Sequence, residues 1–122
     1  MKTLLVVDDD LSLQKLYSEE FETEGYRVML AGSGEEALDL LEDSRPDLVI
    51  MDIRMEGMDG LAAMREILKR DPHIPVILNS AYSNFKNEFS SWSAEAYVVK
   101  SGDLTELKDE VRKALAKREV PR

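Results

Sequence analysis

The sequence predicts an α/β fold: a doubly wound, five-stranded parallel sheet covered by helices on both faces. Short apolar segments alternate with amphipathic segments along the chain. The apolar segments lack the polar–apolar alternation of a half-exposed strand, as is typical of strands buried on both faces. Strands that alternate with helices form right-handed βαβ units, which makes the sheet parallel. A length of 122 residues suits one domain with a single sheet.

The elements can be assigned in order from apolar spacing. Strands are expected at 4–7, 26–31, 48–51, 75–78 and 97–99, and we expect the order 2-1-3-4-5. Helices are expected where apolar residues recur three or four positions apart. The first helix should end at Gly25, and the second before Pro46. The helical positions are Leu13, Leu16, Tyr17 and Phe21; Ala37, Leu38 and Leu41; Leu61, Met64, Ile67 and Leu68; and Leu104, Leu107, Val111, Ala114 and Leu115.

Two segments have weaker patterns. Residues 83–96 are rich in serine and place Phe85 and Phe89 at helical spacing, which predicts a short or irregular fourth helix. The end of the chain from Lys117 onward is charged and is expected to fray. Residues 118–122 are interpreted as this frayed tail or as the start of a linker. Residues 1–122 are otherwise interpreted as one domain.

Composition and charge exclude several classes of function. The net charge of −9 argues against nucleic-acid binding and against anionic membrane surfaces. The sequence contains no Cys, which excludes disulfides and thiolate chemistry and fits a reducing compartment. The one histidine, His73, is expected to lie exposed in a loop between prolines. The sequence shows neither a membrane-spanning apolar run nor a signal-peptide pattern.

The informative polar residues stand where the expected strands end. Asp8 and Asp9 follow the first strand, Asp52 the third, Ser80 the fourth and Lys100 the fifth. In an open parallel sheet, ligands bind beyond the carboxyl ends of the strands, where the strand order reverses. The three carboxylates should therefore crowd one pocket, with Ser80 and Lys100 at its rim.

This set of residue types favours phosphoryl chemistry. Two carboxylates about 4 Å apart repel by about 4 kcal/mol at an effective dielectric of 20, so such a pocket binds a cation or shifts a pKa. An all-oxygen site favours Mg²⁺, with Mn²⁺ or Ca²⁺ as substitutes. An Asp carboxylate can attack a phosphoryl group, while a lysine and a serine hydroxyl stabilise the phosphoryl oxygens. The sequence thus predicts phosphoryl transfer onto Asp52.

Four sequence blocks carry a resemblance to a known family. They are Val6-Val7-Asp8-Asp9-Asp10, the segment from Asp47 to Gly60, the segment from Pro75 to Tyr82, and Ala96-Tyr97-Val98-Val99-Lys100. Together they resemble the CheY-like receiver domain of two-component response regulators, from about Lys2 to Ala116. The resemblance implies a flavodoxin-like fold with Asp52 as phosphoacceptor. It further implies a Mg²⁺ site of Asp8, Asp9, Asp52 and the carbonyl of Arg54; pairing of Lys100 with the phosphoryl group; Ser80 as switch hydroxyl; and Tyr97 as switch aromatic.

The resemblance also implies partners. The phosphodonor would be a sensor histidine kinase or a histidine phosphotransfer protein, and the receiver would act in the cytoplasm. The output would pass to a protein partner or a fused output domain, from a monomer or a phosphorylation-dependent dimer. Such a domain is not an enzyme beyond autodephosphorylation. The alternative is an unphosphorylated interaction module with a vestigial acidic pocket.

Departures from the family pattern carry their own expectations. Glu56 and Ser101 stand where proline is common in the family. The loop at Glu56 is therefore expected to be more mobile, and the Lys100–Ser101 bond is expected to be trans, or cis with strain that its surroundings hold. The segment from Ser80 to Lys100 is shorter than usual, which predicts a remodelled surface there. The resemblance implies that Arg54 and Tyr82, each two positions beyond a site residue, border the phosphoryl group and influence how water reaches it. Because both side chains are bulky, we expect them to prolong the life of that group.

Two rival motifs are weaker. The segment from Gly32 to Ala37 fits the glycine pattern of a dinucleotide site, with Asp52 at the required spacing. However, Ser33 with Glu36 is also a capping box, and a dinucleotide site places its glycines after the first strand. A phosphatase with an Asp-x-Asp nucleophile is disfavoured, because Arg54 stands where the second acid is needed.

Overall fold

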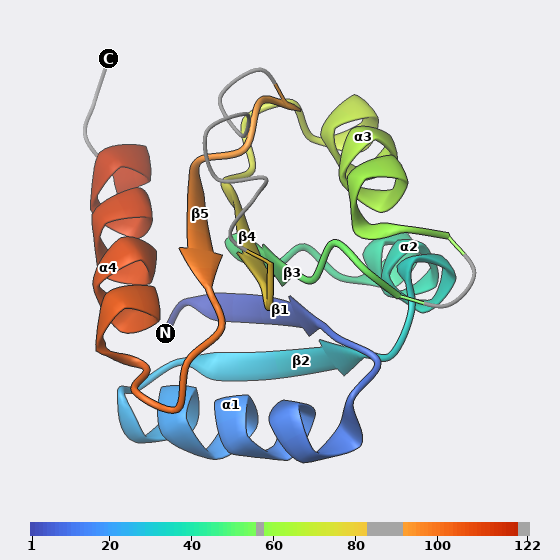
Figure 1. The fold of residues 1–122 in the computed structure, drawn as a ribbon. Helices are drawn as coiled ribbons and strands as arrows, with labels where there is room; N and C mark the ends of the chain where they lie inside the picture. The colour runs from blue at the N-terminus through green and yellow to red at the C-terminus, as the bar shows by residue number, and fades with distance from the viewer. Residues whose placement is uncertain (56–57, 83–91, 120–122) are drawn as a thin grey trace.

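The computed structural model, which describes residues 1–55, 58–82 and 92–119, confirms the expected α/β fold (Figure 1). Its five strands are parallel and lie in the order β2-β1-β3-β4-β5. The strands are β1 (Thr3–Val7), β2 (Arg27–Ala31), β3 (Leu48–Met51), β4 (Val76–Ser80) and β5 (Ala96–Val99). The helices within the described residues are α1 (Leu11–Thr23), α2 (Gly34–Asp43), α3 (Gly60–Arg70) and α4 (Thr105–Glu119).

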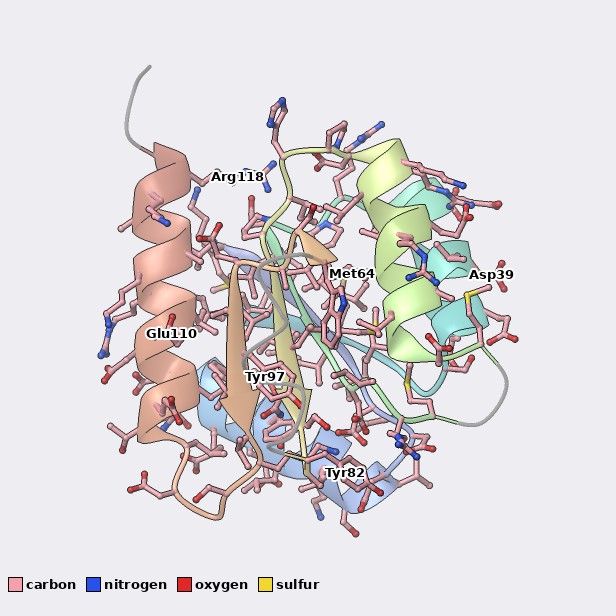
Figure 2. The ribbon with its side chains drawn as sticks, turned by 45° about the horizontal axis from the view of Figure 1, so that its top comes forward. Asp39, Met64, Tyr82, Tyr97, Glu110 and Arg118 are labelled. Atoms are coloured by element: carbon pink, nitrogen blue, oxygen red, sulfur yellow. The ribbon has the colours of Figure 1, made fainter. Side chains whose placement is uncertain are left out.

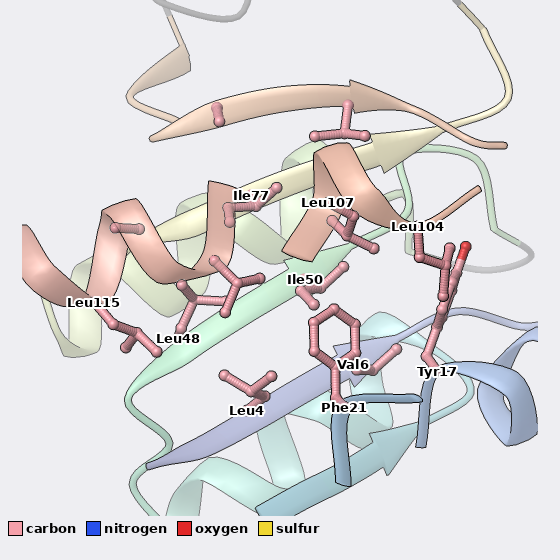
Figure 3. Close-up of a cluster of buried hydrophobic side chains, with 14 residues drawn as sticks. Leu4, Val6, Tyr17, Phe21, Leu48, Ile50, Ile77, Leu104, Leu107 and Leu115 are labelled. Carbon is pink, nitrogen blue, oxygen red and sulfur yellow. The ribbon is translucent and has the colours of Figure 1, made fainter. Parts of the chain in front are cut away.

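The helices cover the sheet as two pairs, and each pair buries its own apolar cluster. Side chains alternate between the faces of a strand, so Leu4 and Val6 pack with α1 and α4, whereas Leu5 and Val7 pack with α2 and α3. Figure 3 shows the first cluster, which joins α1 and α4 to the strands. Burial on both faces explains why the strands are continuously apolar.

The strand register brings the polar strand ends together. Val7 lies opposite Met51, and Ser80 lies opposite Val99. Because all strands run in the same direction, the residues that follow them lie along one edge of the sheet. The structure thereby confirms the placement that the site prediction requires.

Side-chain caps begin three of the helices. Asp10 accepts hydrogen bonds from the amides of Ser12 and Leu13 at the start of α1, and Asp59 accepts one from Ala62 at the start of α3. Ser33 accepts one from the Glu36 amide at 3.1 Å. Such caps satisfy amides that have no partner within the helix.

Packing explains the glycine that begins α2. A Cβ atom at Gly34 would lie 2.9 Å from Ala63 Cβ and 3.2 Å from Met58 Sδ. Glycine therefore allows α2 to approach α3 closely. This role, together with the Ser33 cap, supports the structural interpretation of the glycine pattern over a dinucleotide site.

Some boundaries differ from the prediction. β2 begins at Arg27 rather than at residue 26, and β4 continues to Ser80, because Asn79 and Ser80 pair with β5. The expected fraying from Lys117 stays a prediction, although α4 continues to Glu119 in the part of the chain that the structure describes. Lys117 and Arg118 lie in α4, where Lys117 pairs with Glu95 at 2.9 Å and Arg118 donates to the Asp47 carbonyl at 3.1 Å.

Other expectations have mixed outcomes. The Lys100–Ser101 bond is trans, and His73 is exposed, as expected. Glu56, most of the expected fourth helix (83–91) and the last residues (120–122) lie outside the described residues. Among the described helices, none has the length and apolar character that crossing a membrane requires.

Candidate functional site

Three carboxylates meet at the carboxyl edge of the sheet. Asp8 and Asp9 follow β1, Asp52 follows β3, and one oxygen of each lies within 4.8 Å of the others. Asp8 and Asp52 are 1% and 6% exposed, whereas Asp9 is exposed. The cluster that the sequence predicts is therefore present.

Main-chain bonds hold the two buried carboxylates in place. The Asp52 amide donates to the Val7 carbonyl at 3.0 Å, which ties the end of β3 to the end of β1. Asp8 Oδ1 accepts from the Asp10 amide at 2.9 Å, and Asp52 Oδ1 accepts from the Arg54 amide at 3.3 Å. The position of each carboxylate is thus fixed largely by the backbone.

Lys100 lies between the buried carboxylates. Its Nζ atom is 2.8 Å from Asp8 Oδ2 and 3.0 Å from Asp52 Oδ2. With Asp9 included, three carboxylates and one ammonium leave a net charge of −2 in the pocket. One lysine therefore compensates the cluster only in part.

Burial and charge shift the pKa values in this pocket. Burial raises the pKa of Asp52 above its ordinary value, although the hydrogen bond and charge of Lys100 act in the opposite direction. Burial alone would lower the pKa of Lys100, but its hydrogen bonds to Asp8 and Asp52 outweigh that effect and raise it. Lys100 is therefore charged at neutral pH.

The donor set fits a divalent cation. Its three carboxylate ligands are oxygens, and a charge of +2 would balance the pocket. Oxygen ligands of this kind suit Mg²⁺, and also Mn²⁺ or Ca²⁺. A hollow of about 470 Å³ opens beside Asp9, with Ile53, Met55 and Leu61 in its wall, so the pocket can be approached from outside.

Ser80 and Tyr97 lie on the side of the pocket formed by β4 and β5. Ser80 is fully buried, and its hydroxyl accepts a hydrogen bond from the Tyr82 amide at 3.2 Å. Tyr97 is buried, and its hydroxyl donates to the Tyr82 carbonyl. Figure 2 shows Tyr82 and Tyr97 toward the same end of the molecule, away from Arg118.

Arg54 and Tyr82 stack on each other at the outside of this edge. The Arg54 guanidinium lies 4.9 Å from the centre of the Tyr82 ring, and Tyr82 is 45% exposed. This cation–π contact connects the loop after β3 with the end of β4. Both residues were expected near the site from the sequence, whereas their contact with each other was not.

Four further residues support the site and were missed from the sequence. Gln14 Nε2 donates to the Asp8 carbonyl at 2.7 Å, and Asn79 Nδ2 donates to Tyr17 Oη at 2.9 Å. A Cβ atom at Gly60 would lie 1.9 Å from the Asp52 carbonyl oxygen, so only glycine fits there. An available signal was Asn79 itself, a polar residue inside an apolar strand.

Comparison with protein families gives one match over most of the chain. Residues 4–112 match the family model described as the response regulator receiver domain. Sporulation initiation phosphotransferase F of Bacillus subtilis is 35% identical over 114 residues, which cover 92% of each chain. Regulatory protein AtoC of Escherichia coli is 38% identical over 114 residues. The chain spans about a quarter of the length of AtoC, so its relatives include both short proteins and much longer ones.

Solved structures agree with this match. Response regulator TrrA of Thermotoga maritima, in complex with Mg²⁺-BeF, is 45% identical, with a TM-score of 0.88 and coverage of 93% of this chain and 99% of TrrA. The complex of TrrA with histidine kinase ThkA matches with a TM-score of 0.86, 45% identity and coverage of 94% and 99%. The similarity extends over nearly the full length of both chains.

Proposed function

The chain belongs to the family of response regulator receiver domains, and we propose that its Asp52 accepts a phosphoryl group from a phosphohistidine of a partner protein. One observation carries this proposal. The carboxylates of Asp8, Asp9 and Asp52 lie within 4.8 Å of one another, and Lys100 Nζ lies 3.0 Å from Asp52. These groups provide a nucleophile, ligands for a cation and a positive charge in one pocket.

The proposed reaction is an in-line displacement. A carboxylate oxygen of Asp52 attacks phosphorus, the bond from phosphorus to the donor imidazole breaks, and an acyl phosphate forms. The electron pair of the broken bond stays with the imidazole nitrogen. Asp52 must be ionised to attack, and the Lys100 ammonium favours that form.

The remaining site residues have proposed roles around this step. Asp8, Asp9, Asp52 and the carbonyl of Arg54 would hold Mg²⁺, which when bound neutralises the carboxylates and the incoming phosphoryl oxygens. Lys100 pairs with the phosphoryl group once it is attached, and Ser80 donates its hydroxyl to a phosphoryl oxygen. Ser80 Oγ also accepts from the Tyr82 amide, so a movement of this hydroxyl toward the phosphoryl group would be a rearrangement that changes that bond.

Tyr97 links this rearrangement to the surface. Its hydroxyl donates to the Tyr82 carbonyl, and Tyr82 donates its amide to Ser80. A shift of Ser80 toward the phosphoryl group therefore changes both contacts of the Tyr82 backbone. We propose that this shifts the population between two packings of Tyr97 and so changes a partner-binding surface.

The stack of Arg54 on Tyr82 supports a long-lived phosphoryl group. It spans from the loop after Asp52 to the end of β4, over the edge where the acyl phosphate would stand. Water must reach that phosphorus to hydrolyse it. We propose that the stack slows this access.

The proposed partners follow from the relatives. TrrA forms a complex with a histidine kinase, and phosphotransferase F has nearly the same length as this chain. We propose a sensor histidine kinase or a histidine phosphotransfer protein as the cytoplasmic donor. The output would be a protein partner or a fused domain, from a monomer or a phosphorylation-dependent dimer. The alternative of an unphosphorylated interaction module is not favoured, because the three carboxylates and the Lys100 ammonium that the proposed reaction needs are all present in the pocket.

The test is labelling with a small phosphodonor. Phosphoramidate with Mg²⁺ should add one phosphoryl mass to the wild-type chain, and Asp52→Asn or removal of Mg²⁺ with EDTA should abolish the gain. Asp39→Asn, on the exposed side of α2, is the matched control and should label normally. Absence of labelling in a protein that still binds Mg²⁺ would favour the vestigial module.

A further inference from the structure

A buried polar pair lies beneath the acidic pocket. Asn79 Nδ2 donates to Tyr17 Oη at 2.9 Å, joining β4 to α1 between residues far apart in the sequence. Tyr17 is 1% and Asn79 2% exposed. Figure 3 shows Tyr17 at the border of the apolar cluster, toward the end where the strand arrowheads point. The pair thus stands where the core ends and the site begins.

The alternation of side chains places this pair on the same side as the charged residues. Asn79 lies two positions after Ile77, whose side chain is in the α1/α4 cluster. Asp8 and Lys100 lie two positions after Val6 and Val98, which belong to that cluster too. The charges of Lys100, Asp8 and Asp52 all act on the Tyr17 hydroxyl, whose pKa burial raises. The hydroxyl is therefore neutral and close to the pocket.

Helix α1 also supports the end of β1, where the proposed metal ligand Asp8 lies. Gln14 stands three positions before Tyr17, on the same side of α1, and donates to the Asp8 carbonyl at 2.7 Å. Asp10, which caps α1, donates its amide to Asp8 Oδ1. Through Gln14 and Tyr17, α1 contacts the ends of both β1 and β4, although β3 separates these strands in the sheet.

We propose that Tyr17 and Asn79 are positioning residues for phosphoryl transfer: their hydrogen bond anchors the end of β4 to α1 and so fixes Ser80 relative to Asp52 and Lys100. This inference rests on the proposed function. Asn79 precedes Ser80 directly, so a lateral movement of Asn79 moves the switch hydroxyl with it. The bond lies on the opposite face of the strand from the Ser80 side chain and constrains the backbone that carries it.

Packing alone gives no reason for this pair. Phe at position 17 and Leu at position 79 would fill similar space without burying a hydroxyl and an amide, whose dehydration offsets much of what the bond contributes. A buried hydrogen bond instead supplies direction, because it holds two elements at one distance and angle. Such a constraint suits a strand end that must present Ser80 accurately.

The experiment compares Tyr17→Phe, Asn79→Leu and the double variant with wild type. Each single variant should lower the initial rate of Asp52 phosphorylation by phosphoramidate by about tenfold at saturating Mg²⁺. The double variant should be no slower than the slower single, because both remove one bond. The Mg²⁺ dissociation constant, measured by calorimetry, should be unchanged within about twofold, since the carboxylates are intact.

Tyr26→Phe is the matched control. Tyr26 packs against the same apolar cluster but directly precedes β2, at the opposite edge of the sheet. The loss of its hydroxyl should leave the phosphorylation rate at the wild-type value. A thermal melt of every variant verifies folding, and if Asn79→Leu does not fold, Tyr17→Phe against Tyr26→Phe decides.

Three results would overturn the inference: wild-type rates in Tyr17→Phe, rate losses that multiply in the double variant, or a parallel loss of Mg²⁺ affinity. If the wild-type chain itself takes no phosphoryl group, the proposed function fails. In that case the NMR amide resonances of Ser80 and Lys100 still test whether the Tyr17–Asn79 bond positions Ser80. They should shift in Tyr17→Phe but not in Tyr26→Phe, and unchanged resonances would refute it.

Discussion

Replacement of Asp52 by asparagine should stabilise the metal-free protein, although it removes the proposed phosphoacceptor. Asp52 is 6% exposed and shares its pocket with two other carboxylates. Asparagine keeps the shape and the hydrogen-bonding oxygen but carries no charge. The substitution therefore removes repulsion and the cost of burying a charge, while Lys100 keeps its ion pair with Asp8.

The magnitude follows from the distances. Coulomb's law at an effective dielectric of 20 gives about 3.5 kcal/mol of repulsion for each carboxylate pair at the 4.8 Å limit, and Asp52 takes part in two pairs. The attraction of Lys100 at 3.0 Å offsets about 5.5 kcal/mol of that. Because Asp9 is exposed, solvent weakens its share, so the charge interactions nearly cancel, and the cost of burying the Asp52 charge gives the substitution its sign. We expect Asp52→Asn to raise the free energy of unfolding by about 1 kcal/mol, or the melting temperature by about 4 °C.

The assay is urea unfolding at neutral pH with EDTA, repeated with Mg²⁺. Without metal, Asp52→Asn should unfold at higher urea than wild type. Mg²⁺ should stabilise wild type much more than the variant, because the variant has lost one ligand. Asp39→Asn removes an exposed carboxylate from α2 and should change neither curve.

The pH dependence gives the sign independently. The folded-state pKa of Asp52 is raised, so its ionisation opposes folding at pH above that value. The destabilisation disappears as the pH falls below the ordinary pKa of Asp, where both states are protonated. The advantage of Asp52→Asn should accordingly be full at neutral pH and vanish in acid. A less stable variant at neutral pH, or equal stabilisation of both proteins by Mg²⁺, would refute the reasoning.

Four other substitutions test three separate parts of the structure. Arg54→Ala and Tyr82→Ala should each speed hydrolysis of the Asp52 phosphate by about threefold, the factor for losing a cation–π contact; unchanged decay of the labelled protein would contradict the shielding role. Gly60→Ala should destabilise the fold by about 3 kcal/mol in urea unfolding, because its Cβ atom would lie 1.9 Å from the Asp52 carbonyl oxygen. Ser33→Ala should cost about 1 kcal/mol through loss of a helix cap, with normal phosphorylation; lost labelling would point to a function for that loop.

The sequence predicts most of the fold because its strands are buried on both faces. Continuous apolar segments such as 4–7 and 48–51 are stable in a domain of this size only when they are buried on both sides. Both form strands, β3 with the predicted ends and β1 with one additional residue at its start. The site residues were predictable for a related reason. In a parallel sheet, a polar residue directly after such a strand must lie at the carboxyl edge, as Asp8, Asp52 and Lys100 do.

Residues whose role depends on the third dimension were not predictable. Tyr17 has the spacing of an ordinary core residue in α1, and only the structure shows its hydroxyl meeting Asn79. The contact of Arg54 with Tyr82 joins two loops whose relative position no local pattern specifies. The contacts at the end of α4 were not predictable either, because Lys117 and Arg118 pair with Glu95 and with the Asp47 carbonyl, which lie in loops distant in the sequence.

The way the carboxylates are held supports the proposed role of the pocket as a switch. Asp52 is tied to β1 through its amide, and the Gly60 amide donates to the Ile53 carbonyl at 2.8 Å, so the backbone on both sides of the site is fixed. The buried carboxylates of Asp8 and Asp52 also accept from the Asp10 and Arg54 amides, so they cannot separate without breaking hydrogen bonds. The repulsion between the carboxylates can then be lowered by binding a proton or a cation, or by a movement of the Lys100 ammonium. A phosphoryl group on Asp52 would redistribute that charge, and the groups free to respond are side chains, above all Lys100 and the hydroxyl of Ser80.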